Sequence, residues 1–328
     1  MSKMPSRHNL ILIHKTDLIF STPTGEPMPN FRIFGGSSSS ASYNAIVEHY
    51  ETDSKVHETH SASSLGLSGY QHREVVVSSG TMSALADASW ANRVVKNVLP
   101  HGAGNQQHSI HATSGESWAR MHLGYEKYSG GGITNHLKRA QKFQGGNCSV
   151  HASIAAAALK SKGVDRPICR MRIRLPEDNS HEFVMLGDHR EPHFGERNTV
   201  VVDAWPAHPS ASTLDQTVLH DASRGTHMAL TDLMGQYRNE TWDVSDTASR
   251  SDMALLRDVK VLNSDKLQKK LREQGLPALH SADLVSHALN DDSFGSFDVR
   301  VNTDPSTTYT RDSQYYGRSF DYLFNDHH

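Results

Sequence analysis

The chain has 328 residues, a length that suits one large domain or two of ordinary size. Its 33 Lys and Arg nearly balance 36 Asp and Glu, and the formal net charge of -3 argues against a protein built mainly to coat nucleic acid or an anionic membrane. Apolar residues make up only 36 %, less than in most compact domains, so we expect an ordered core with polar flanks.

Two cysteines, Cys148 and Cys169, are too few for a disulfide framework, which favours a reducing compartment. Charged residues and histidines interrupt the segment Met1–Leu18, which therefore lacks the apolar stretch of a secretory signal. Every apolar run falls far short of the roughly 20 residues that a membrane-spanning helix needs. We therefore expect no membrane insertion.

The polar flanks lie at the two ends of the chain. Residues 1–67 are rich in Pro, Gly and Ser, and we expect a flexible leader and candidate secretion signal, with at most a short strand at Leu10–Ile13. Residues 68–250 form the expected catalytic domain. Residues 251–328 form a helical C-terminal extension with a polar tail, to which we assign no element from Asn302 onward.

Helical periodicity begins after the leader. Apolar side chains predict a helix over Met82–Leu99 that ends before Pro100, and a further helix around Trp118–Tyr125. The stretch His101–Gly115 between them is polar and contains glycine, and we assign no element to it. Gly130–Gly132 is expected to be a hinge or loop, because it lacks the Lys-Ser or Lys-Thr of a phosphate-binding loop.

The segment from Gly145 to Pro206 has the clearest pattern. An alanine-rich helix is predicted over Cys148–Lys162, with Gly163 as its C-cap. Alternating side chains then predict a strand over Ile168–Leu175 and an antiparallel strand over His181–Leu186. Thr199–Asp203 is expected to form a third strand.

The first of these strands has two different faces. One face is apolar and includes Cys169, which we interpret as a core residue. The other face carries three arginines, which are expected to lie at an exposed or partner-facing surface: Arg170, Arg172 and Arg174.

Two helices are predicted in the C-terminal extension. The first is amphipathic, with Ser264 as its N-cap and Gly275 as its stop signal. The second covers Ala282–Leu289.

Three polar residues in this central segment can form a catalytic triad. Cys148 opens a helix, where the aligned peptide dipoles lower the pKa of a thiol, and the preceding glycines let a substrate approach the backbone. His181 and Asp203 lie on neighbouring predicted strands. Cys148 would attack, His181 would move the proton and Asp203 would orient His181.

The simpler interpretation is that Cys148 is a small buried residue of an alanine-rich helix. Three features favour the triad instead: the position at the helix start, the preceding glycines, and a His and an Asp in apolar strands in suitable order. The predicted fold class is α+β, with the helix that bears the thiol packed on a small antiparallel sheet among additional helices.

The three motifs Gly146–Cys148, His181–Val184 and Val202–Trp205 resemble those of transglutaminase-like and papain-like cysteine enzymes, whose chain order is Cys, His, then Asp or Asn. The spacing and the leader are more narrowly similar to plant-pathogen type III effectors of the HopX (AvrPphE) group. The resemblance covers residues 145–206. It implies a papain-like or transglutaminase-like fold, a protein substrate in a host cell, and secretion into host cytoplasm by a type III route.

The resemblance also implies an oxyanion donor upstream of the thiol, because a tetrahedral intermediate places negative charge on the former carbonyl oxygen. The backbone N–H of Cys148 is one candidate. Gln144 and Gln141 are two more, four and seven residues upstream, whereas papain-like enzymes use a spacing of six. Each glutamine fits a surface position equally well.

The expected function is a thiol-dependent amide hydrolase that acts on a protein, first of all a cysteine protease of the secreted-effector type. A glutamine deamidase or transglutaminase uses the same triad, and a protein that only binds a host partner is the alternative from another class. The histidines are scattered and show no zinc motif, so we expect no metal. We also expect no cofactor, and the near balance of charge predicts no nucleic-acid partner.

Overall fold

The computed structural model describes residues 54–55, 72–175, 179–222, 225–236, 240–243 and 248–312. They all belong to one compact unit, which starts at Ile33. Their fold is mixed α and β, which confirms the predicted class at this level. Apart from strand β1 (Ser54–Lys55), the expected leader lies outside the described residues, as does the strand expected at Leu10–Ile13.

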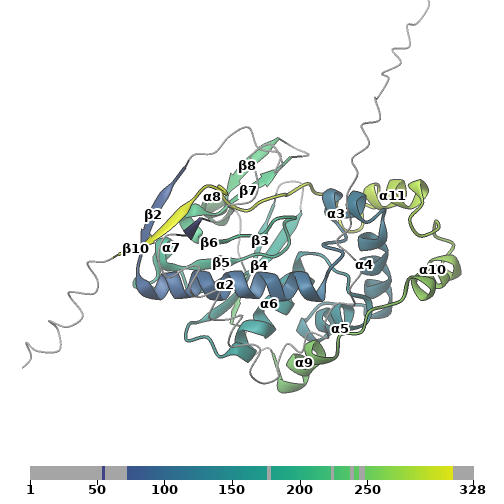
Figure 1. The fold of residues 1–328 in the computed structure, drawn as a ribbon, viewed down its shortest axis with the longest axis horizontal. Helices are drawn as coiled ribbons and strands as arrows, with labels where there is room; N and C mark the ends of the chain where they lie inside the picture. The colour runs from purple at the N-terminus through teal and green to yellow at the C-terminus, as the bar shows by residue number, and fades with distance from the viewer. Residues whose placement is uncertain are drawn as a thin grey trace, which may run out of the picture. The chain divides into compact units, whose positions relative to one another are not determined.

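A five-stranded antiparallel sheet forms the centre of the fold (Figure 1). Three of its strands were predicted, and two short edge strands were not. In spatial order the strands are β6 (Ala211–Thr213), β5 (Val200–Val202), β4 (Ser180–Leu186), β3 (Ile168–Arg174) and β9 (Glu240–Asp243). With three and four residues, β6 and β9 are too short to show a period of two in the sequence.

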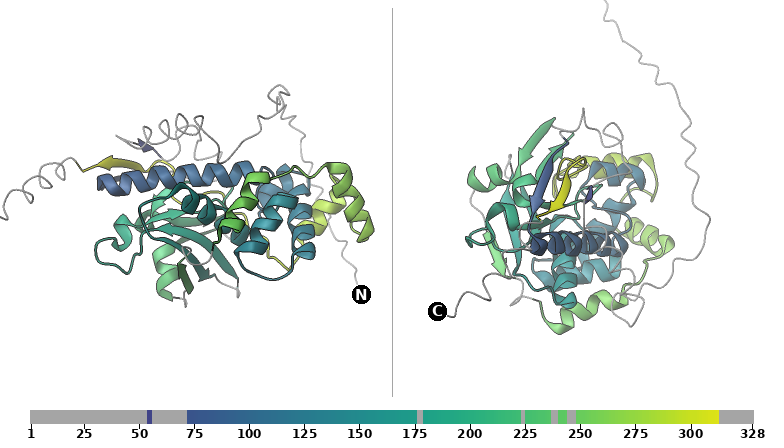
Figure 2. Two further views of the ribbon diagram at one scale, coloured as in Figure 1. Left: turned by 90° about the horizontal axis from the view of Figure 1, so that it is seen from below. Right: turned by 60° about the vertical axis from the view of Figure 1, so that its left-hand side comes forward.

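Two helices cover one face of this sheet, and both were predicted. Helix α2 (Ser79–Val98) starts at the N-cap Ser78, whose hydroxyl accepts a hydrogen bond from the backbone N–H of Thr81. Helix α6 (Cys148–Lys162) ends at Gly163, whose positive φ of 74° suits a left-handed C-cap. Figure 2 shows α2 running along the strands. The helices pack on the strand residues of this face: Val184, Leu186, Val200 and Val202.

The opposite face of the sheet carries a second apolar cluster. Cys169 is a member, only 5 % exposed, which confirms its place in the core. The hairpin of β7 (Val218–Asp221) and β8 (Thr226–Ala229) and helix α8 (Leu230–Gln236) contribute Leu219, Leu230 and Leu233 to this cluster.

The remaining helices gather at one end of the sheet (Figure 1). They are α3 (Gln107–Ala112), α4 (Glu116–Lys127), α5 (Ile133–Phe143), α9 (Arg250–Ala254), α10 (Ser264–Glu273) and α11 (Ala282–Leu289). Helices α4, α10 and α11 match the predictions, and Gly130–Gly132 is the predicted loop before α5. Helix α10 is capped by Asn263 rather than Ser264, because the Asn263 Oδ1 accepts from the N–H of Asp265 at 2.7 Å.

Helix α3 was not predicted and lies within the polar stretch His101–Gly115, to which no element was assigned. Its six residues bury only Ser109 and Ile110, which is too little to produce a helical period in the sequence. Short helices α7 (Gly195–Asn198), Leu214–Gln216 and Leu255–Asp258 were also not predicted.

The segment after Asn302 also contains an element that was not expected. Strand β10 (Thr308–Arg311) pairs in parallel with β2 (Glu74–Val77) and antiparallel with β1. The Tyr309 side chain is fully buried, and its hydroxyl accepts from the N–H of Thr213 at 2.9 Å. These partners are more than 90 positions away, so local sequence carries no signal for them.

None of the helices in these ranges is both long enough and apolar enough to cross a lipid bilayer.

Candidate active site

Cys148 is the first residue of α6, and two glycines shape the turn that leads to it. A Cβ atom on Gly145 would lie 2.4 Å from the carbonyl carbon of Arg120, and one on Gly146 would lie 2.3 Å from the Cβ of Val150. Both distances are shorter than real contacts allow. The turn therefore needs glycine because the chain passes against α4 and folds back on the first turn of α6.

The thiol lies where two strands of the sheet separate. Strand β5 pairs with β4 only along Val184–Leu186, so the start of β4 at His181 has no partner on β5. Cys148 belongs to the apolar cluster of Trp205, whereas Val150, two residues later in α6, belongs to the cluster on the other face. The start of α6 thus reaches across the sheet at the point where β5 has ended.

His181 and Asp203 form a buried pair beside the thiol. The Nε2 atom of His181 lies 2.7 Å from Oδ2 of Asp203, and the two side chains are 1 % and 3 % exposed. The backbone N–H of Trp205 donates to the other carboxylate oxygen at 3.1 Å. Nδ1 of His181 has no hydrogen-bond partner among the described residues, and the Cys148 thiol lies close enough to raise the pKa of this imidazole. The structure therefore brings the three predicted side chains together.

The surroundings of His181 favour its protonated form. Burial alone lowers the pKa of an imidazole, because it removes water from the charged form. The charge and hydrogen bond of Asp203, together with the interaction with Cys148, outweigh that effect and raise the pKa of His181 to about 10. An imidazolium at neutral pH is the partner that stabilises a neighbouring thiolate.

An indole ring holds the imidazole in place. The rings of Trp205 and His181 are 4.6 Å apart at 35°, and the indole Nε1 donates to Oδ1 of Asn105 at 2.9 Å. The Nδ2 atom of Asn105 donates in turn to the carbonyl of Phe294 at 3.2 Å. Asn105 was not predicted, because it lies 100 positions from Trp205 in a stretch to which no element was assigned.

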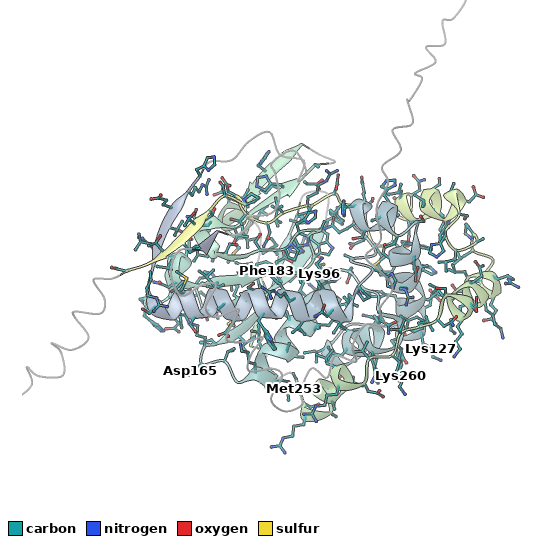
Figure 3. The ribbon with its side chains drawn as sticks, viewed as in Figure 1. Lys96, Lys127, Asp165, Phe183, Met253 and Lys260 are labelled. Carbon is teal, nitrogen blue, oxygen red and sulfur yellow. The ribbon has the colours of Figure 1, made fainter. Side chains whose placement is uncertain are left out.

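A lysine behind Asp203 was also not predicted. The ammonium of Lys96, near the end of α2, donates to the carbonyl of Pro206 at 2.8 Å. Burial lowers the pKa of Lys96 to about 8, and the charge of Asp203 opposes that shift. Figure 3 labels Lys96 and Phe183 in the central part of the structure, and Lys127 and Lys260 at its helical end.

Gln144 does not have the geometry of an oxyanion donor. Its Nε2 donates to the carbonyls of Lys260 and Gln141, and its Oε1 accepts from the N–H of Leu262 at 2.7 Å. Arg120 donates to the same oxygen at 3.1 Å. The whole carboxamide is thus used to join α5 to the segment before α10, which corrects the expectation for Gln144. Gln141 has no described contact with a triad side chain, and its role stays a prediction.

Asn147 offers a different donor. It is the N-cap of α6, yet its side chain makes no capping hydrogen bond, although Asn at this position normally does. Its Oδ1 accepts instead from the hydroxyl of Tyr125 at 2.8 Å, and the guanidinium of Arg139 lies 3.6 Å above the Tyr125 ring. The carboxamide is therefore held by its oxygen, and no described residue accepts from Nδ2 of Asn147 or from the backbone N–H of Cys148.

In the described ranges, no three His, Cys, Asp or Glu side chains are grouped as metal ligands. No protein-family model, curated protein or solved structure matches the chain. The functional argument therefore depends on the geometry of the site.

Proposed function

We propose that the protein is a thiol-dependent amide hydrolase that acts on a protein substrate, with a cysteine protease as the first candidate. The observation that carries the proposal is the buried arrangement of Cys148 beside His181, whose Nε2 lies 2.7 Å from Oδ2 of Asp203. A structural cysteine needs neither a helix start nor a protonated imidazole. Either feature activates a nucleophilic cysteine, and Cys148 has both.

The chemistry follows from the charges of the pair. The thiolate of Cys148 attacks the carbonyl carbon of the amide, and the negative charge moves to the carbonyl oxygen. The imidazolium of His181 then gives its proton to the leaving nitrogen as the C–N bond breaks, which leaves a thioester on Cys148. His181, now neutral, removes a proton from water, and hydrolysis releases a carboxylic acid and restores the thiolate.

Two donors are proposed for the oxyanion. The backbone N–H of Cys148 lies on the attacking residue itself, and Nδ2 of Asn147 lies on the residue before it. Tyr125 acts here as a positioning residue, because its hydroxyl holds the oxygen of the Asn147 carboxamide. The Asn147 side chain makes no capping hydrogen bond, which costs stability at the start of α6. Such local losses of stability are typical of functional sites.

The burial of the thiol favours a second candidate, a glutamine deamidase or transglutaminase. Cys148 is only 6 % exposed. A glutamine side chain can reach a recessed thiol through a narrow opening more easily than a peptide backbone can. The same thioester then forms with release of ammonia, and water or an amine resolves it.

Mass spectrometry of candidate protein substrates incubated with the full chain tests the proposal. Hydrolysis of the backbone gives two fragments, deamidation adds about one dalton, and transamidation gives a cross-linked product. We expect one of these products with the native chain and none with Cys148→Ala. Equal amounts of product from both chains would contradict the proposal.

We also propose, from the resemblance to HopX-type effectors and the Ser-rich leader, that the protein is secreted by a type III route into host cytoplasm. Fusing residues 1–67 to a reporter tests this. Secretion of the reporter that requires a functional type III apparatus supports the proposal, and its retention contradicts it.

A further inference from the structure

The residues that directly follow the nucleophile and the general base also meet. Ser149 follows Cys148 on α6, and Glu182 follows His181 on β4. The hydroxyl of Ser149 donates to Oε2 of Glu182 at 2.7 Å. Helix α6 and strand β4 therefore meet in two neighbouring pairs. Cys148 and His181 belong to the triad, and Ser149 and Glu182 do not.

The two pairs lie on opposite sides of strand β4. Successive side chains of a strand point to opposite faces, so His181 and Glu182 diverge. His181 packs on Trp205, on one side of the sheet. Glu182 meets Ser149 and Arg170, on the side that α6 covers. The first turn of α6 therefore contacts β4 from both sides.

Glu182 is itself held firmly. It is 1 % exposed, and its Oε1 lies 2.9 Å from Nε of Arg170, while Arg172 reaches Oε2 at 3.4 Å. The arginine face of β3 was expected to be exposed or to meet a partner, and Arg170 instead pairs with this carboxylate inside the chain. A buried carboxylate with such partners is costly to move, because any displacement leaves a charge uncompensated.

We propose that Ser149 and Glu182 are positioning residues that set the approach of the Cys148 thiol to His181. Neighbouring residues of a helix are about 100° apart around its axis. A rotation of α6 that moved the thiol away from His181 would therefore also break the hydrogen bond between Ser149 and Glu182. The inference rests on the proposed function, because it assigns these residues to the thiolate and imidazolium pair.

Ser153 provides a matched control. It lies one turn later in α6, is fully buried, and donates to the carbonyl of Ser149 at 2.7 Å. Its hydroxyl also lies 2.8 Å from Nδ1 of His136 on α5. The Ser153 hydroxyl also accepts from Nη1 of Arg170 at 3.4 Å. Removing this hydroxyl takes away buried hydrogen bonds of the same helix and leaves the hydrogen bond between Ser149 and Glu182 in place.

The test measures the rate of Cys148 alkylation by iodoacetamide between pH 5 and 10, by peptide mass spectrometry, in the full chain. We expect Ser149→Ala to lose about tenfold in rate at pH 6 and to shift toward the profile of an ordinary thiol, because a small misplacement weakens the ion pair. Ser149→Thr keeps the hydroxyl and restores the native profile. Ser153→Ala keeps the native profile even where its melting temperature falls.

A Ser149→Ala profile that superimposes on the native one overturns the inference. So does an equal shift in Ser153→Ala, because the effect would then be one of general stability. A native chain without reactivity at pH 6 overturns the proposed function instead, and the two failures are therefore distinguishable.

Discussion

The two cysteines of the chain are buried to nearly the same extent and have opposite surroundings. Cys148 is 6 % exposed and Cys169 is 5 % exposed. Cys148 begins a helix and lies beside His181, whose pKa is raised to about 10. Cys169 is the second residue of β3, opposite Met185 on β4 and among the apolar side chains of the same cluster, and the cation near it is Arg190 rather than an imidazolium.

This contrast shows that burial alone does not determine what a thiol does. An apolar environment opposes ionisation, whereas a helix start and a cation favour it. The same chain therefore contains a candidate nucleophile and an internal reference that shares its solvent, its temperature and its exposure. The first and the last of the following tests compare the two thiols directly, and the others examine the surroundings of Cys148 and of the buried histidines.

The largest effect is expected from removing each thiol in turn. Cys148→Ala should lower turnover of an amide substrate by about 10⁴-fold or more, since the nucleophile cannot be replaced. Cys169→Ala should leave turnover within about twofold and lower the free energy of unfolding by about 1 kcal/mol, because it only removes a buried sulfur. Turnover assays and urea denaturation measure the two effects. Full turnover by Cys148→Ala would leave only a binding role for the site.

The next effect concerns the carboxylate. Asp203→Asn should lower turnover by up to about 10⁴-fold, because the imidazole loses the charge that stabilises its protonated form and orients its ring. The pKa of His181 should fall from about 10 toward its ordinary value, since burial then acts with less opposition. Its titration can be followed by NMR.

Asp215→Asn is the matched control for that variant. The Asp215 carboxylate accepts hydrogen bonds from Thr213 and Gln216 and has no described contact with a triad side chain. It should leave both turnover and the titration of His181 unchanged. A fall of similar size in both variants would show that Asp203 has no special role.

Replacing the proposed oxyanion donor should have a smaller effect, which lowers turnover but not the reactivity of the thiol. Asn147→Ala is expected to lower turnover by about tenfold to 10²-fold, because a tetrahedral intermediate loses a hydrogen bond. Alkylation of Cys148 by iodoacetamide forms no oxyanion, so its rate should stay within about twofold of the native rate. Tyr125→Phe should show the same separation to a lesser extent. Equal losses in both assays would place Asn147 among the residues that hold the helix start.

The smallest effect is a dependence of stability on pH that comes from two other histidines. Burial lowers the pKa of His136 and of His151 to about 3, the opposite of its outcome at His181. Between that value and about 6.5 the unfolded chain binds more protons, so stability is complete above about pH 6.5 and falls below it.

As the pH falls from 6.5 to 5, each of these histidines takes up a proton only in the unfolded chain. The free energy of unfolding should therefore fall by about 2 kcal/mol for each of them. Urea denaturation at the two pH values measures the difference. Burial also lowers the pKa of His220, to about 4, so replacing one histidine, as in His136→Gln, should remove only that residue's own contribution of about 2 kcal/mol. A stability that is independent of pH over this interval would contradict the assigned neutral state.

The sequence predicted the region of the triad well because its elements are local. Helix α6 and strand β3 show regular apolar patterns, and a glycine closes the helix. Cys148 is placed by the start of α6, His181 by the start of β4, and Asp203 by the end of β5. Strands β6, β9 and β10 were missed because each is at most four residues long, and β9 and β10 are also defined by partners far away in the chain.

The residues around the triad could not be predicted for the same reason. Asn105 supports Trp205 across 100 positions, and Glu182 carries no pattern that distinguishes it from a surface glutamate. Gln144 is an error of the opposite kind, because a functional role was predicted for a residue that has a structural one. It had a suitable residue type near a suitable spacing, yet its hydrogen bonds to Lys260 and Leu262 use the carboxamide elsewhere.

The most direct test compares the pH dependence of alkylation at the two thiols of the native chain, by peptide mass spectrometry. At pH 6 an ordinary thiol is about 0.3 % ionised, and a stabilised thiolate gains about tenfold in net rate after its weaker nucleophilicity is counted. We predict that Cys148 reacts at a nearly constant rate from pH 6 to 9. Cys169 should gain about tenfold per pH unit below its pKa. Parallel profiles for the two cysteines would contradict the account.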